Sequence, residues 1–215
     1  MAKGKEMIPF GAAIAGDVLS VLQMPGGGFL GKLGDKYLER KQREAAEILI
    51  AEVSNGSAGP IEFSGRETDP LIEIIYRFSK AVSDGAAREN LRLLAKIIAG
   101  LKKNKALDPD KFRRWANILE QLTRDELMVI GKAIAIRRKI VAGGPEAAND
   151  FWQRLEVELK ASGYNPDEIG PLCTSVSRTG LLIPMSAWGG TVYIASPWIE
   201  ELGDLADVEA IIAAK

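Results

Sequence analysis

The chain has 215 residues, of which 47% are hydrophobic and 27% are charged, so it can bury a sizeable core as one or two globular domains. A formal net charge of −1 excludes an overall basic nucleic-acid binder, and the absence of histidine excludes the commonest acid–base residue and the usual imidazole metal ligands. A single cysteine, Cys173, excludes an internal disulfide and is typical of a cytoplasmic protein. We therefore expect no enzyme, with no catalytic residue, no cofactor and no metal site.

The first segment, residues 1–56, begins with an apolar run from Met7 to Leu22. This run is shorter than the about 20 residues of a membrane-spanning helix, and Asp17 interrupts it. Its large apolar side chains recur mainly at steps of three and four residues, so a helix here would present one apolar stripe to a partner protein, a second copy or a membrane surface. The stripe consists of Met7, Ile8, Phe10, Ile14, Val18, Leu19 and Leu22.

A glycine-rich break at residues 25–28 separates this run from a second apolar pattern. Apolar residues from Leu30 to Val53 are three and four positions apart, which predicts a long amphipathic helix. Residues 57–67 are rich in Ser, Gly and Pro and have no periodic face, so we expect a linker.

Residues 68–162 carry repeated signals for the ends of helices. Asp69–Pro70 and Asp108–Pro109 each offer an N-cap followed by proline, and Thr123 to Glu126 has the capping-box pattern. Gly143–Gly144 should end the helix that follows. Short connections between successive helices predict a helical bundle.

The C-terminal residues, 163–215, change from a helical to a strand-like period. A helix that starts at Asn165–Pro166 should lead to a strand at residues 181–183, a turn at 185–190 and a strand at 191–194. A lone hairpin is marginal in water, so Trp188 or Tyr193 must cover helix side chains. The predicted fold is mainly α, a helical bundle with a small C-terminal winged-helix-like β-hairpin packed on it.

The charge of this C-terminal module argues against DNA recognition. Its helix at 166–178 would be the recognition helix of a winged-helix domain, yet it offers Arg178 against Asp167 and Glu168. Residues 163–215 contain two basic and seven acidic residues, a net charge of −5, which would repel a phosphate backbone. We therefore do not expect duplex DNA to bind.

Two basic groups and one acidic group need separate interpretation. The basic groups each end a helix, where positive charge is favourable, and an anion or RNA would bind only if they converged. Asp204, Asp207 and Glu209 are expected on a solvated tail. The candidate anion contacts are Lys102, Lys103, Lys105, Arg137, Arg138 and Lys139.

Three short stretches carry a resemblance to a known family: LTRDE at 122–126, IGPLCTSVSRTGLLIP at 169–184 and GGTVYIASPWIEEL at 189–202. With them, residues 68–202 resemble the bacterial abortive-infection alpha family and related uncharacterised helical proteins. The resemblance implies a phage-defence or prophage accessory role and supplies no catalytic residue.

The leading interpretation is a non-enzymatic helical interaction protein that binds a protein partner or self-associates. One alternative is a winged-helix transcriptional regulator that binds DNA. A second is a peripheral membrane or pore-related factor that acts through residues 7–30.

Overall fold

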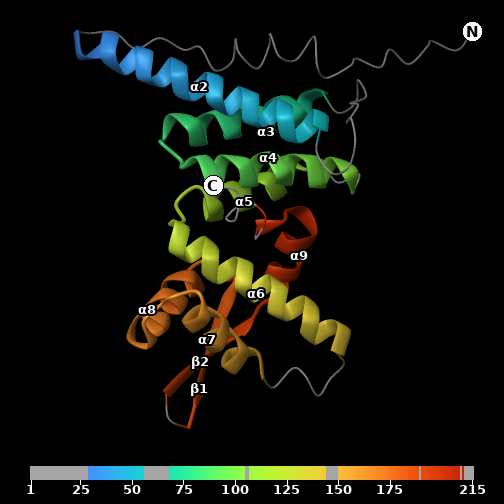
Figure 1. The fold of residues 1–215 in the computed structure, drawn as a ribbon. Helices are drawn as coiled ribbons and strands as arrows, with labels where there is room; N and C mark the ends of the chain where they lie inside the picture. The colour runs from blue at the N-terminus through green and yellow to red at the C-terminus, as the bar shows by residue number, and fades with distance from the viewer. Residues whose placement is uncertain are drawn as a thin grey trace, which may run out of the picture. The chain divides into compact units, whose positions relative to one another are not determined.

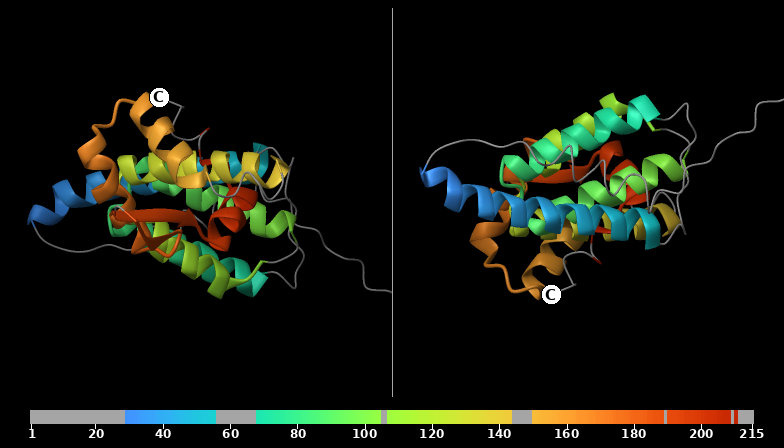
Figure 2. Two further views of the ribbon diagram at one scale, coloured as in Figure 1. Left: turned by 90° about the horizontal axis from the view of Figure 1, so that it is seen from below. Right: turned by 90° about the horizontal axis from the view of Figure 1, so that it is seen from above.

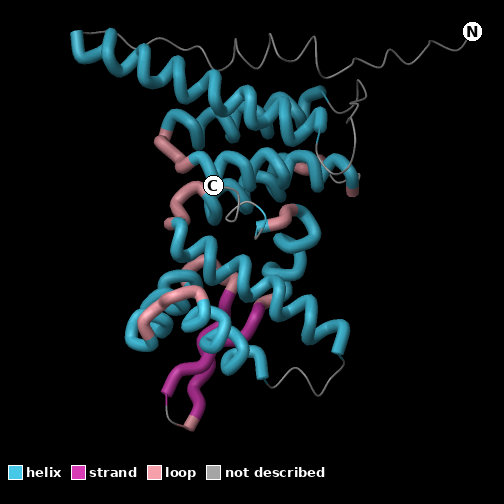
Figure 3. Tube along the Cα trace, viewed as in Figure 1, coloured by secondary structure: helices cyan, strands magenta, loops and turns pink. Residues whose placement is uncertain are grey.

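The structure is a computed structural model that describes residues 29–55, 68–104, 107–143, 150–188, 190–208 and 210. These residues are mainly helical and include one two-stranded antiparallel sheet near the C-terminal end, which confirms the predicted fold class (Figures 1 and 3). They form two compact units that meet in the sequence between Gln121 and Leu122. The predicted apolar stripe of residues 7–22 and the linker at 57–67 lie outside the described residues.

The first unit contains four helices in its described residues: α2 (Phe29–Asn55), α3 (Thr68–Ser83), α4 (Arg88–Lys103) and α5 (Pro109–Leu119). Helix α4 packs against each of the other three because its apolar side chains, from Leu91 to Leu101, cover a broad face. Figure 2 shows α2 lying along α4. Asp108 accepts hydrogen bonds from the backbone N–H groups of Asp110 and Lys111, so α5 begins at the predicted cap.

Ion pairs, both exposed and partly buried, join the helices of the first unit. Glu44 of α2 contacts Arg88 of α4 at 3.1 Å, and Arg77 of α3 contacts Glu120, just after α5, at 2.7 Å. Glu73 of α3 likewise contacts Arg113 of α5. Charged side chains of this unit therefore hold neighbouring helices together.

The second unit is built around α6 (Arg124–Gly143). Around it lie α7 (Phe151–Ala161), α8 (Pro166–Ser177) and α9 (Pro197–Leu205), with a hairpin of β1 (Leu182–Ala187) and β2 (Gly190–Ala195). Buried side chains from Leu127 to Ile140 lie on several faces of α6, so it can pack against α7, α8, α9 and β2. Both strands of the hairpin contact helices of this unit: α7 and α6 pack on β2, and α8 on β1.

The unit boundary differs from the expected division after residue 162. Helices α6 and α7 pack with α8 and the hairpin, so the described residues from Leu122 onward form one unit. The capping signal Thr123 to Glu126 starts this unit. The capping residues and prolines predicted where helices begin and end. They could not predict which helices share a core, because that depends on contacts between residues far apart in the sequence.

The hairpin also differs in detail from the prediction. Strand β1 continues to Ala187 and β2 begins at Gly190. Residues 185–187 and 190 of the predicted turn therefore belong to the strands. Pro184 lies within β1, opposite Tyr193. A proline is tolerated there because each strand of a two-stranded sheet has an open edge.

The expectation that Asp204, Asp207 and Glu209 lie on a solvated tail is wrong for Asp204, which lies in α9. Ser196 caps this helix by accepting a hydrogen bond from the Trp198 backbone N–H, and Pro197 follows it. Ile199 and Leu202 are fully buried. Residues 197–205 are therefore part of the second unit. Residue 209 lies outside the described residues, and the exposed Asp207 accepts a hydrogen bond from the Ala210 N–H.

Candidate interaction surface

Tyr193 attaches the hairpin to the helices. Its ring centroid lies 5.1 Å from that of Trp152 on α7, and its hydroxyl shares a hydrogen bond with Thr174 of α8. The same hydroxyl lies 3.3 Å from the Gly170 carbonyl oxygen, to which it donates. Tyr193 is 3% exposed, whereas Trp188 at the tip is fully exposed. Of the two aromatic residues that the sequence offered for covering the helices, Tyr193 does so.

The opposite face of the hairpin, which we call the outer face, is apolar and exposed. The antiparallel register places Ile183 beside Ile194 and Met185 beside Val192. Side chains alternate between the two faces of a strand, so these four lie opposite the Tyr193 face. Ile183, Met185 and Ile194 are 39%, 47% and 41% exposed. No charged residue occurs from position 182 to 195, so neither face of the hairpin carries a charge.

Glu126 connects the start of α6 to the end of α8. It completes the capping box with Thr123, whose backbone N–H donates to the carboxylate at 2.8 Å. Its other oxygen accepts hydrogen bonds from the Ser175 hydroxyl and, at 3.0 Å, from the Arg178 guanidinium. Burial raises the pKa of Glu126, but these hydrogen bonds outweigh burial and lower the pKa to about 2. The carboxylate is therefore ionised at neutral pH and fixes α8, which leads into the hairpin.

This contact also occupies the one basic residue in the predicted recognition helix. Arg178 follows α8 and forms an ion pair with Glu126, while Asp167 and Glu168 lie in the first turn of α8. The Glu168 carboxylate accepts a hydrogen bond from the Asn165 backbone N–H as part of a capping box. The charged side chains of α8 thus lie at the two ends of the helix, where Glu168 caps the start and Arg178 is paired with Glu126. This argues against phosphate binding by α8.

Cys173 has the environment of a core residue. It is fully buried on α8, and burial, with a smaller contribution from the charge of Glu156, raises the pKa of its thiol to about 12. The thiol is therefore protonated at neutral pH, and the reactive thiolate is scarce.

The six candidate anion contacts are divided between the two units of the chain. Lys102 and Lys103 end α4 in the first unit, Lys105 lies outside the described residues, and the three residues from Arg137 to Lys139 belong to α6. Even the α6 triplet is divided between two depressions. Arg137 and Arg138 line a pocket between α6 and α9, whereas Lys139 lines one between α6 and α7.

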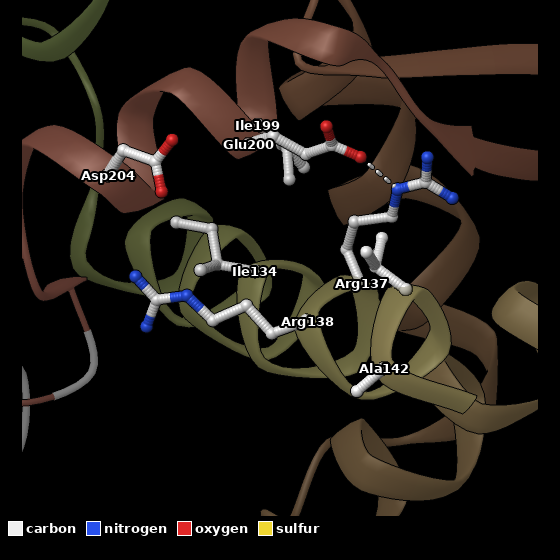
Figure 4. Close-up of a pocket in the computed structure, with 8 residues that line it drawn as sticks. Ile134, Arg137, Arg138, Ala142, Ile199, Glu200 and Asp204 are labelled. Atoms are coloured by element: carbon white, nitrogen blue, oxygen red, sulfur yellow. Dashed lines mark hydrogen bonds and ion pairs between the residues drawn. The ribbon is translucent and has the colours of Figure 1, made fainter. Parts of the chain in front are cut away.

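The pocket between α6 and α9 was not predicted from the sequence. It has a volume of about 310 Å³ and is lined by Arg137, Arg138, Glu200, Asp204 and apolar side chains of both helices (Figure 4). Arg137 donates to Glu200 at 2.5 Å, and Arg138 donates to the Gly203 carbonyl. The repeated cap-plus-proline signal at Ser196–Pro197 could have revealed α9, but spacing alone does not pair α9 with α6.

The apolar stripe from Met7 to Leu22, which was predicted to contact a partner or membrane, lies outside the described residues. Among the residues that the structure does describe, no helix combines the length and apolar character needed to cross a membrane. The same residues contain no group of three or more Cys, Asp or Glu side chains placed to hold a metal ion.

In comparisons with known proteins, no family model, no curated protein and no solved structure matches this chain. The resemblance of residues 68–202 to the abortive-infection alpha family stays a prediction from the three sequence stretches.

Proposed function

We propose that this chain is a non-enzymatic interaction protein, and that the outer face of its hairpin binds a second copy of the chain. The observation that carries the proposal is the exposure of Ile183, Met185 and Ile194 together on an uncharged hairpin, with Trp188 fully exposed at its tip. Contiguous exposed apolar side chains mark protein contacts, whereas single exposed ones are ordinary.

A second copy of the chain suits this surface because the surface carries no charge. A twofold-symmetric dimer brings the same patch of both copies together, so any charge at its centre would face an identical charge. The hairpin has no charge from position 182 to 195, and its outer face can therefore meet itself without repulsion. Its strands also lack the lysine or glutamate side chains with which exposed edges commonly oppose pairing.

The size of the outer face sets the expected strength of the dimer. The exposed apolar side chains of the hairpin offer on the order of 500 Å² per copy, since an aromatic alone buries about 150–250 Å². Stable interfaces bury about 800 Å² on each partner. We therefore expect a reversible dimer with a dissociation constant of about 10 μM.

The test is sedimentation velocity of the full chain over about a hundredfold range of concentration centred on that value. We expect Ile183→Lys to raise the dimer dissociation constant at least about tenfold, because two lysines would meet in place of two apolar side chains. Ile72→Lys is the matched control, since Ile72 is 55% exposed on α3 of the first unit, and it should leave the constant unchanged.

Two results would contradict the proposal: a monomer at every concentration, or a dimer that Ile183→Lys does not weaken. A chain that begins at residue 29 addresses the competing expectation for the N-terminal stripe. If that chain is monomeric and Ile183→Lys has no effect in the full chain, association belongs to residues 1–28. Dimerisation that survives the truncation and fails with Ile183→Lys supports the outer face.

The winged-helix alternative predicts salt-dependent binding of duplex DNA. The acidic balance of residues 163–215 and the ion pair of Arg178 with Glu126 support the protein interaction instead. The three stretches that resemble the abortive-infection alpha family are the support for placing this interaction in phage defence.

A further inference from the structure

The pocket between α6 and α9 has an apolar floor and a charged rim. The accessible part of this floor is Val141, which is 62% exposed, and the exposed Ala142, since Ile134 and Ile199 leave only 4% and 0% of their surfaces open. The rim carries two guanidinium groups, of Arg137 and Arg138, and two carboxylates, of Glu200 and Asp204. The volume of about 310 Å³ lies at the small end of the range for ligand pockets, about 300–1,000 Å³.

The charged side chains are paired with each other at one end of the pocket and not at the other. At one end Arg137 and Glu200 form an ion pair at 2.5 Å, and in Figure 4 a dashed line joins them. At the other end Arg138 and Asp204 lie on opposite sides of the opening, with no ion pair between them. Within the described residues, the Asp204 carboxylate has neither a hydrogen-bond nor an ion-pair partner.

The open end therefore offers one group of each sign to a ligand. Arg138 uses a guanidinium nitrogen to donate to the Gly203 carbonyl, and a guanidinium has five N–H donors, so donors remain for a carboxylate. Asp204 lies in the last turn of α9, where the helix dipole disfavours a negative charge, and a bound cation would relieve this.

We propose that this pocket binds a small zwitterion with a branched apolar side chain, of the class of the aliphatic α-amino acids. The ligand carboxylate accepts hydrogen bonds from Arg138, the ammonium group donates to Asp204, and the side chain lies on the exposed apolar lining, Val141 and Ala142. A simple anion would face two carboxylates and a simple cation two guanidinium groups, whereas a zwitterion satisfies the unpaired groups of both signs. This site is separate from the outer face of the hairpin, so it adds to the proposed function.

The test is isothermal titration of the full chain with L-leucine. The comparison ligands are 4-methylpentanoate, which lacks the amino group, and 3-methylbutylamine, which lacks the carboxylate. We expect leucine to bind with a dissociation constant of about 0.1–1 mM, and each comparison ligand to bind at least about tenfold more weakly.

The variant Asp204→Asn should reduce the affinity for leucine at least about tenfold and remove its preference over 4-methylpentanoate, since only the ammonium contact is lost. Asp207→Asn is the matched control: Asp207 is an exposed aspartate that follows α9 and does not line the pocket, and its variant should bind leucine as the natural chain does. Ile183→Lys should also leave leucine binding unchanged, so failure of the dimer and failure of this site can be told apart.

The proposal is overturned if 10 mM leucine gives no heat and no chemical-shift change in the amide signals of α6 and α9. It is also overturned if Asp204→Asn binds leucine as tightly as the natural chain. Tighter binding of 4-methylpentanoate than of leucine would also contradict the proposal and would indicate an anion site. Arg138→Gln, with its melting temperature measured because Arg138 also holds Gly203, should weaken leucine and 4-methylpentanoate alike.

Discussion

The Glu126 carboxylate stabilises the second unit because both of its oxygens accept hydrogen bonds. The side chain is 4% exposed, and its two oxygens accept from Thr123, Ser175 and Arg178. A buried charge with fewer partners would cost several kcal/mol, so the contacts must be kept as a set. Ser175 and Arg178 lie 49 and 52 positions from Glu126, whereas Thr123 lies three, so the sequence showed only the local capping box.

We expect Glu126→Gln to lower the free energy of unfolding by about 2–3 kcal/mol at pH 7, since an NH₂ group replaces one of the two accepting oxygens and leaves the donors on that side without an acceptor. The pKa of Glu126 is lowered in the folded chain, from 4.5 to about 2, so its contribution to stability is present above pH 4.5 and disappears as the pH falls through 2. Urea unfolding of both chains at several pH values measures this. Their difference should shrink from pH 5 toward pH 2, and a constant difference would contradict the assigned ionisation.

At the scale of secondary structure, helix ends were largely predictable and helix partners were not. Local side-chain caps such as Asp108 and Asn165 start helices where the sequence predicted them, because the capping residue and the backbone groups that it binds are at most three positions apart. Helix α9 was missed although Ser196–Pro197 repeats the same signal. The outer face could be recognised only once the register placed Ile183 beside Ile194, and the pocket only once α9 lay on α6.

The packing of α9 on α6 requires a residue without a side chain at Gly203. A Cβ atom there would lie 2.8 Å from Ile134 Cγ2 and 3.3 Å from Arg138 Nη2. We expect Gly203→Ala to lower the free energy of unfolding by about 1–3 kcal/mol, although alanine favours helix, because α9 must move away from α6. Asp204→Ala is the control at the next position of the helix, where a side chain is already accommodated, and urea unfolding should show a change of at most about 0.5 kcal/mol. Equal stability of Gly203→Ala and the natural chain would show that the contact is not tight.

For the whole molecule, the division between Gln121 and Leu122 places both proposed surfaces in the second unit. The hairpin, its Tyr193 anchor and the pocket between α6 and α9 all belong to residues 122–215. Helices α7, α8 and α9 and strand β2 pack directly on α6. Both proposed surfaces therefore lie within one unit that has its own central helix.

We predict that residues 122–215, expressed without the first unit, fold cooperatively. The unit has its own central helix, and a domain of this size is stable by about 5 kcal/mol or more when its core is closed. Far-ultraviolet circular dichroism should show a helical chain, and urea should unfold it in one transition with the same midpoint by circular dichroism and by tryptophan fluorescence. The fragment should retain the sensitivity of its dimer to Ile183→Lys and its affinity for leucine, because the residues proposed for both lie within it. A fragment without a cooperative transition would mean that contacts from residues 1–121 complete its core, and the two compact units would then form a single folding unit.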